Sequence, residues 1–495
     1  MEDHSAPELS FGIERRFSVS TSTGALSFES PDSSRATLDG QTQSYWSDVL
    51  MNKSNEALAQ QETPSEIESS IKASFPLIQW SIDEVARMSG PESAEESLSR
   101  SQEFFMGRWE NNELAPEVNL STREIVYFSN FVKRCAGWFD IFDHQQHFAS
   151  HAAHLARYDE GLMNAVLALA AHHLLHLQSR TNIVPTVSLD DAAKFYSKAL
   201  CYVQRAMQHT SYAQSQELLA TSLIVSAYEM MTGSMEGWTR HLKGVYWIQR
   251  CQRVNSLSPG LRQAVWWSWL RQEQWAAFLE KRKSLSYWEP PEPMSTQTSD
   301  QLVSFITIIL RHAINFAAPR DSGQLTSVQY LAGRMQIAEK ILQDLAEWEG
   351  YLDPLIRPQA YDPSCIDPGI SQTVRDNFQP MWIYPHRFAV ARQMFHFARI
   401  LVYMNRPILN GLGTDVDVRK ALRESVSAIG GIALALEDEA GQLISSQCLF
   451  GAGMCEYVDS RQKAILELID RCERRGGWPA GQLKNDLQQH WIDAG

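Results

Sequence analysis

Histidines are the side chains whose type and spacing come closest to a chemical site in this chain. Four of them recur at intervals of three, four and three residues: His144, His147, His151 and His154. His172 and His176 stand one helical turn apart. Histidines at i and i+4 on a helix can chelate zinc, and a third ligand would complete a catalytic centre. No H-E-x-x-H pattern occurs, and the first cluster is predicted to run from a loop into a helix start. Histidines at the surface or core edge are therefore the favoured interpretation, and a metal-dependent enzyme is the minor alternative.

Other catalytic signatures do not occur in the sequence. It contains no G-x-S-x-G, no G-x-x-x-x-G-K-[ST] and no G-x-G-x-x-G, so nucleophilic, phosphate-binding and dinucleotide-binding motifs are missing. Glu437, Asp438 and Glu439 are adjacent in sequence and would point to different sides of a helix. The sequence therefore predicts a protein that is not an enzyme, with no catalytic, cofactor-binding or metal-ligating residues.

Four charged or titratable side chains fall within strongly apolar helical patterns: Arg240, His241, Arg271 and Glu273. A charged group persists in such a setting only with a partner or a hydrogen-bond network. The favoured interpretation is a structural polar network that joins two helices. The alternative is a pocket for an inducer or metabolite between helix layers.

The overall composition limits the kind of fold that can position these residues. The chain has 495 residues, 44% of them hydrophobic, and a net charge of −14. It can bury a large core, but a broad basic surface for nucleic acid is disfavoured. No apolar run of eighteen residues suggests a membrane span, and the acidic N-terminus does not read as a secretory signal. Seven scattered cysteines indicate reduced thiols in a cytosolic or nuclear protein.

Residues 1–118 are predicted to form a disordered, Ser-rich arm. The first fifty residues contain eleven serines, a composition that cannot bury enough apolar surface to offset the entropy of ordering. Two aromatic islands interrupt the arm, at 75–80 and 104–109. They are expected to pack on the folded body or, in the alternative, to fold on a partner as activation segments do. Arg15-Arg16 before Ser18 is a candidate site for a basophilic kinase.

Residues 119–495 are predicted to form an all-α domain. Ser121 and Glu124 have the spacing of a capping box, and no strand alternation is sustained. The region 351–368, with four prolines, is expected to be a loop between two helical halves. About twelve amphipathic patterns follow one another, at 121–137, 159–178, 188–209, 214–232, 236–250, 259–283, 300–317, 324–350, 376–406, 415–438, 441–459 and 459–475.

One segment is unusually rich in tryptophan. Trp266, Trp267, Trp269 and Trp275 fall within ten residues, beside Arg271-Gln272-Glu273. On a helix these side chains would cover it broadly with large apolar groups, which predicts a core helix.

This block and others in the same order resemble the fungal-specific transcription factor regulatory domain, the C-terminal region of fungal zinc-cluster regulators. The similar blocks are Tyr127–Val132 with Trp138–Asp143, Leu162–Leu174, Ala199–Val203 with Leu218–Glu229 and Trp238–Gly244, the tryptophan block, Ala391–Pro407, and Phe450–Gly453 with Gly477–Pro479 and Trp491. The resemblance implies an all-helical regulator that acts in the nucleus, with shuttling to the cytoplasm left open. It also implies protein partners from the transcription machinery, a DNA-binding partner or a second copy, and it leaves a small-molecule effector open.

Members of that family usually begin with a binuclear zinc cluster, in which two C-x2-C-x6-C halves hold two Zn²⁺ and present a basic helix to DNA. Here no cysteine precedes Cys135, and no C-x2-C pair occurs. Cys448 and Cys455 have the C-x6-C spacing of part of that cluster, but both lie within a helical pattern. We therefore predict a regulator of metabolic or secondary-metabolite genes without its own zinc cluster, so that direct DNA binding is not expected. A helical scaffold or corepressor without promoter targeting is the alternative.

Overall fold

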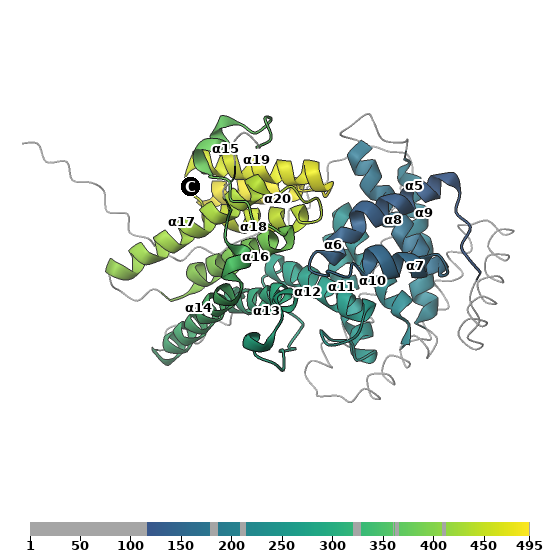
Figure 1. The fold of residues 1–495 in the computed structure, drawn as a ribbon, viewed down its shortest axis with the longest axis horizontal. Helices are drawn as coiled ribbons and strands as arrows, with labels where there is room; N and C mark the ends of the chain where they lie inside the picture. Colours follow the sequence, from purple (N-terminus) through teal and green to yellow (C-terminus); the bar gives the residue numbers. More distant parts are fainter. Residues whose placement is uncertain are drawn as a thin grey trace, which may run out of the picture.

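Helices account for nearly all regular structure in this chain (Figure 1). The structure, a computed structural model, describes residues 116–178, 187–207, 214–319, 328–359, 361, 366–407 and 412–494. Across those residues it contains sixteen α-helices and two π-helical segments, and its one β-bridge joins Gln359 to Trp382. The all-α prediction is confirmed. Most of the predicted arm, both aromatic islands and Ser18 lie outside the described residues.

The N-terminal half surrounds a helix that is buried on all sides, α8 (Glu160–Gln178). α5, α9 and α10 all pack on α8, and α11 packs on α10. The elements of this half are α5 (Thr122–Asn130), the π-helical segment η2 (Phe131–Cys135), α6 (Ala136–Asp140), the π-helical segment η3 (Phe148–Ala152), α7 (Ala153–Ala156), α9 (Leu189–Ala206), α10 (Gln216–Thr232), α11 (Met235–Cys251) and α12 (Leu261–Leu279).

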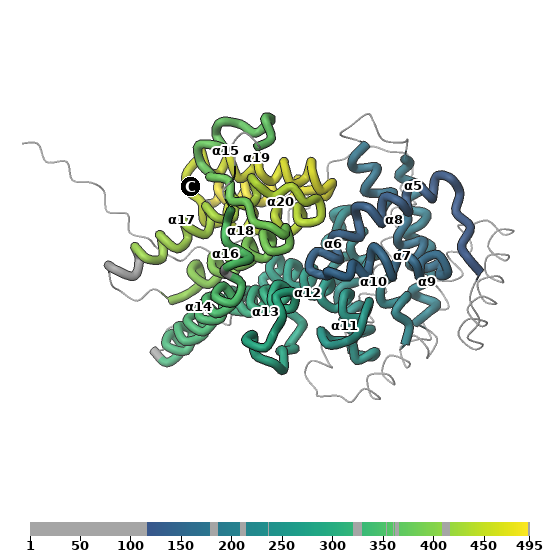
Figure 2. The backbone as a smooth tube through the Cα atoms, viewed as in Figure 1, coloured from purple at the N-terminus to yellow at the C-terminus, as the bar shows by residue number. Residues whose placement is uncertain are grey.

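The C-terminal half is built around α16 (His386–Asn405), which contacts α13, α14, α17 and α18. In Figure 2 this half, green to yellow, lies beside the blue to teal N-terminal half. Its other elements are the short helix η5 (Met294–Thr296), α13 (Ser299–Ala317), α14 (Val328–Ile356), α15 (Gln372–Asn377), α17 (Leu412–Ala435), α18 (Gln442–Gly453), α19 (Asp459–Gly476) and α20 (Gly481–Ala494).

Local signals place several helix starts correctly. Ser121 and Glu124 form the predicted capping box: Ser121 Oγ accepts from the Glu124 N–H, and Glu124 accepts from the Ser121 N–H at 2.8 Å. Thr298 and Gln301 form a second box at α13. Such boxes satisfy N–H groups that have no partner within the helix.

Prolines account for two differences from the predicted boundaries. The predicted helix 376–406 begins only at His386, because Pro380 and Pro385 disfavour helical backbone in the residues before them; the short α15 ends before both prolines, at Asn377. By contrast, α14 continues through Pro354 to Ile356, into the region predicted as a loop. Leu352 and Ile356 are buried there, so packing outweighs the hydrogen bond that proline removes.

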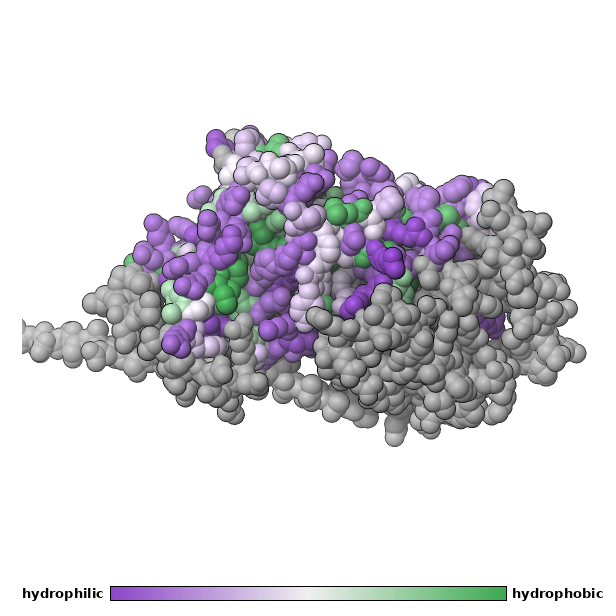
Figure 3. All heavy atoms as spheres, turned by 90° about the horizontal axis from the view of Figure 1, so that it is seen from below, coloured by the Kyte–Doolittle hydropathy of each residue, from purple (hydrophilic) through white to green (hydrophobic). Residues whose placement is uncertain are grey.

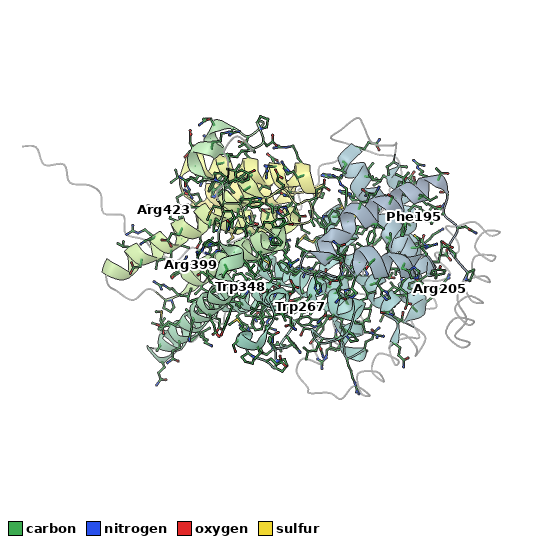
Figure 4. The ribbon with its side chains drawn as sticks, viewed as in Figure 1. Phe195, Arg205, Trp267, Trp348, Arg399 and Arg423 are labelled. Carbon is green, nitrogen blue, oxygen red and sulfur yellow. The ribbon has the colours of Figure 1, made fainter. Side chains whose placement is uncertain are left out.

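Both halves share α12, the helix of the tryptophan block. Trp269 donates its indole N–H to the Leu242 carbonyl of α11 at 2.9 Å. One turn or more further along, Trp275 and Phe278 lie edge-on to Phe450 of α18 at 5.8 and 6.2 Å. In the view of Figure 4, Trp267 appears near the middle of the molecule, with Phe195 of the N-terminal half on one side and Trp348 of the C-terminal half on the other. The prediction of a core helix is confirmed, and the helix is covered by both halves. On the face seen in Figure 3, hydrophobic side chains appear as small patches among hydrophilic ones.

Candidate functional site

Glu273 sits at the centre of a buried polar network on α12. Its side chain is fully buried, and it accepts hydrogen bonds from Arg282 Nη1 at 2.6 Å, Ser284 Oγ at 2.5 Å and the Leu285 N–H at 3.0 Å. Burial opposes the charge of Arg282, but Glu273 and Glu280 keep its pKa above the usual range. This carboxylate therefore holds the segment that follows α12 against the helix.

Arg311 of α13 completes that network from the other side. It is 1% exposed and donates to the Trp288 carbonyl at 2.6 Å and the Ser286 carbonyl at 3.2 Å. Its second amino group contacts Glu289. Arg311 was not among the residues predicted from the sequence, although its position directly after Ile308-Ile309-Leu310 indicates a buried charge.

His241 belongs to a second network, which joins α9, α10 and α11. Its Nδ1 lies 2.5 Å from a carboxylate oxygen of the buried Glu229, and Tyr196 donates to the other oxygen. Burial of the imidazole works against its charge, yet Glu229 and the Gly237 carbonyl raise the pKa of His241 above its ordinary value. Tyr196 also stacks on Tyr228, with ring centroids 4.6 Å apart.

Arg271 contacts the turn between α6 and η3. It donates to the Phe139 carbonyl at 2.7 Å, and its guanidinium lies 5.4 Å from the centre of the Phe142 ring. Burial lowers the pKa of Arg271 to about 10, although Asp140 and Asp143 oppose that shift. Asp140 accepts the Phe148 and Ala149 N–H groups at 2.9 Å each, and burial raises its pKa to about 7.

The four residues chosen from the sequence thus have three different sets of partners. Arg240 is half-buried next to His241 on α11, and its charge opposes protonation of that histidine. His241 and Glu273 contact other helices or segments through hydrogen bonds. These are the contacts of polar networks between elements, and a role for the four residues in ligand binding stays a prediction.

The histidine cluster follows the turn at Asp143 into η3, as predicted. His147 Nδ1 is 2.6 Å from the Asp143 carboxylate, whereas His144 is 3.9 Å from Asp300 of α13. His151 is exposed, and His154 lies edge-on to Tyr158 at 5.4 Å. Within the part of the chain that the structure describes, no three His, Cys, Asp or Glu side chains are placed to hold a metal ion.

Polar and aromatic contacts also join the two halves along the seam between them. Arg134 binds both carboxylate oxygens of Glu439, at 2.6 and 2.7 Å. Trp138 meets Trp478 edge-on at 4.8 Å, and His176 is 3.3 Å from Glu473. These contacts join η2, α6 and α8 to the segment before α18, to the segment after α19 and to α19 itself. We take this seam as the candidate functional site.

His173 is buried at the seam, edge-on to Trp138 with ring centroids 5.2 Å apart. It is fully buried, 3.0 Å from Asn130 Nδ2 and 3.7 Å from Cys135 Sγ, and burial lowers its pKa to about 3. Burial also raises the pKa of the Cys135 thiol. A neutral thiol and a neutral imidazole are poor nucleophilic partners, so this pair is part of the packing.

Comparison with known proteins assigns the first half of this architecture. Residues 126–269 match the fungal specific transcription factor domain. That match runs from α5 to Trp269, midway along α12. These residues carry a fungal specific transcription factor domain.

A curated relative is similar over a longer part of the chain. The chain is 24% identical over 364 residues to the transcription activator AMTR1 of Alternaria alternata. The aligned part is 61% of this chain and 47% of that relative, so the chain spans about half its length. No solved structure matches the chain. Along the described residues, none of the helices is both long and apolar enough to cross a membrane.

Proposed function

We propose that this chain is the regulatory part of a fungal transcription regulator, which works by binding rather than by catalysis and acts in the nucleus. The domain match over α5 to α12 carries the proposal. The relative, named as a transcription activator, supports it. Control of a metabolic or secondary-metabolite gene set, and shuttling to the cytoplasm, belong to the same proposal.

The seam is the element through which such a domain would respond. Trp275 and Phe278 of α12 pack on Phe450 of the C-terminal half, while Trp269 is bonded to α11. A partner or effector that prefers one packing of the halves would shift the equilibrium toward it. Because α12 touches both halves, such a shift would reach both.

Promoter recognition is assigned in this proposal to another module. The 495 residues contain no C-x2-C pair, and the charge of −14 disfavours phosphate binding. A DNA-binding partner, or a zinc cluster outside this sequence, would bring the domain to its promoter.

A tethering assay tests the proposal. The chain is fused to an unrelated DNA-binding domain in a fungal host that carries a reporter gene with the matching sites. We expect a several-fold change in reporter transcription relative to the DNA-binding domain alone. A Phe278→Ala variant should alter that response, whereas Lys463→Ala, on an exposed face of α19, should not. A reporter level equal to that of the DNA-binding domain alone, with normal protein abundance, would refute a regulatory role.

A second measurement tests the part that concerns DNA. The purified chain is titrated onto random-sequence duplex at low salt, and zinc is determined on the same sample. Weak binding that disappears with added salt, and no stoichiometric zinc, is the expected result. Tight, sequence-selective binding would overturn the assignment of promoter recognition to another module.

A further inference from the structure

The charged side chains of α16 and of the residue that follows it are all positive. Residues 386–406 contain four arginines and neither aspartate nor glutamate. Arg392, Arg399 and Arg406 are seven residues apart, which is close to two helical turns, so they lie along one side of the helix. His396 falls on the same side, four residues after Arg392 and three before Arg399. We call these four residues, Arg392, His396, Arg399 and Arg406, the α16 stripe.

The α16 stripe faces two neighbouring helices. Arg392 forms an ion pair with Glu349 of α14, and Arg399 lies 3.4 Å from Glu424 of α17. α16 packs on both helices, which lie on either side of it (Figure 1). The side chains of Arg392 and Arg399 are 19% and 25% exposed. Both arginines are therefore half-buried between the helices and still accessible from solvent.

Aromatic rings hold the guanidinium groups of the stripe in place. Arg392 lies over Phe395, 4.5 Å from the centre of the ring. Arg399 and Arg406 both lie over Tyr403, at 5.7 and 4.9 Å from its centre. A guanidinium group that is already fixed against a ring loses little further freedom when it binds an anion. Its paired N–H groups match the oxygens of a carboxylate or a phosphate.

The carboxylates nearby do not use all the donors of the stripe. Among the described residues, Arg406 has no ion pair. Nη1 of Arg392, the atom nearest Glu349, is buried and has no hydrogen-bond partner in the same part of the chain. Glu424 is 50% exposed, and its contact with Arg399 is long for a charge-assisted hydrogen bond. Donors on one side of α16 thus remain available to a further anion.

His396 is the second sign of a missing partner. It is 5% exposed, and its buried Nδ1 has no hydrogen-bond partner in the described structure. Burial, together with the charges of Arg392 and Arg399, holds the pKa of His396 well below its usual range. The imidazole is therefore neutral and carries one N–H. A buried polar atom without a partner costs free energy, and an anion between the two arginines would supply that partner.

We propose that Arg392, His396 and Arg399 bind a small organic anion with at least two acidic groups, either carboxylates or phosphates. The two arginines are about 10 Å apart along the helix axis, so each guanidinium binds a different acidic group. The Nδ1–H tautomer of His396 donates to an oxygen between them. Arg406 adds to the attraction for the anion. Regulation through this site rests on the proposed function, whereas the binding itself does not.

Isothermal titration calorimetry of the full chain tests the site. The probes are citrate and pyrophosphate at constant ionic strength, with the uncharged triethyl citrate as control. We expect at least one of the two anions to bind with millimolar or tighter affinity and the ester not to bind. Binding of citrate alone would assign the site to carboxylates, and binding of pyrophosphate alone would assign it to phosphates. Binding of neither anion would overturn the proposal.

Two variants of His396 separate binding from folding. His396→Leu removes the unpaired nitrogen at similar volume, so the melting temperature of the free chain should stay the same or rise. Its affinity for the anion should fall about tenfold or more, as for the loss of a hydrogen bond to a charged group. His396→Asn keeps an N–H close to the position of Nδ1 and should retain most of the affinity. An affinity unchanged in His396→Leu would contradict the role of the imidazole and overturn the proposal.

Charge variants give changes of opposite sign. Arg399→Gln should weaken binding about tenfold or more. Glu424→Gln releases Arg399 and should strengthen binding several-fold. The matched control Lys463→Gln removes an exposed cation of α19 and should leave the affinity unchanged. If Lys463→Gln weakens binding as much as Arg399→Gln does, the anion responds only to net charge and the proposal is wrong.

The tethering assay distinguishes this inference from the proposed function. Binding of the anion by a chain that gives no reporter response would refute only the proposed function. A reporter response from a chain that binds neither anion would refute only this inference.

Discussion

Buried charges in this protein are matched to carbonyls and carboxylates of the chain itself. Arg471 is 2% exposed and donates to the Ala433 and Leu436 carbonyls near the end of α17. Arg334 donates to the Phe316 and Asn405 carbonyls at the ends of α13 and α16. Carbonyls at a helix C-terminus lack partners within the helix and carry partial negative charge. A buried arginine is therefore, by itself, no sign of a ligand site here.

Glu273→Gln tests the network on α12. The amide keeps the shape of the side chain but removes the charge that faces Arg282, which retains only Glu280. We expect the free energy of unfolding to fall by about 3 kcal/mol, as for other broken buried pairs. Urea denaturation measures it. The control is Asp459→Asn, in an exposed pair with Lys463, where the loss should stay below about 1 kcal/mol. Equal losses in the two variants would show that Glu273 contributes no more to the free energy of unfolding than an exposed carboxylate does.

His241→Gln tests the second network through its pH dependence. The pKa of His241 is raised in the folded protein, so its protonated form stabilises the fold. That stabilisation is complete below the unfolded pKa and is lost as the pH rises through the folded pKa. The variant should lose about 1.5–3 kcal/mol at acidic pH and progressively less as the pH rises. Denaturation curves from pH 5 to 9 measure the difference, with the exposed His151→Gln as control. A difference independent of pH would exclude a role for the charge.

At the scale of elements, close approach of backbones decides which helices fit together. A side chain at Gly430 of α17 would place its Cβ 2.3 Å from ring carbons of Phe378. The neighbouring Gly431 accepts a hydrogen bond from the Met381 N–H at 2.9 Å. The segment after α15 thus lies directly on the C-terminal part of α17, and a larger residue there would push it away.

Gly430→Ala and Gly333→Ala form a matched pair. The first should destabilise the protein by about 1–3 kcal/mol because Phe378 must move. The second, in α14, meets nothing within 4 Å, so it should stabilise the protein by about 0.5–1 kcal/mol through helix propensity. Thermal unfolding of both variants measures the contrast. If both changes shift the melting temperature in the same direction, Phe378 does not restrict the size of the residue at position 430.

At the scale of the whole molecule, α12 couples the two halves. Trp269 in the middle of α12 is bonded to α11, and its later part packs on α18; the seam adds Arg134–Glu439 and Trp138–Trp478. A substitution in α12 should therefore destabilise helices of both halves, whereas a substitution at the outer edge of one half should affect only the helices next to it.

Hydrogen exchange of two variants tests that coupling. Trp275→Ala should cost about 3–5 kcal/mol and increase exchange in α10 and α11 as well as in α16 and α18. Phe195→Ala, at the contact of α9 with Tyr127 of α5, should increase exchange in α5, α8 and α9 only. If Trp275→Ala affects the C-terminal half alone, the two halves are independent units.

Much of the secondary structure was predictable from the sequence, because helical periodicity and capping are local. Ser121 and Glu124 marked the start of α5, and the tryptophan block predicted a core helix that the structure confirms. The short helices α7 and α15 and the last helix α20 were missed, since a few turns with mixed polarity leave a weak periodic signal. Resemblance, rather than periodicity, indicated the fungal specific transcription factor domain.

The sequence by itself determined the all-helical class and several of the residues that could carry buried charge. Only the tertiary structure decided which partners those residues have. Glu273 meets Arg282 nine residues on, whereas Arg134 meets Glu439 across 305 residues, and Arg311 was not anticipated at all. Helix formation depends on neighbours three and four residues away, but satisfying a buried charge depends on whichever helix is packed against it. The partner of a buried charge therefore depends on how the whole core packs, and local spacing in the sequence does not predict it.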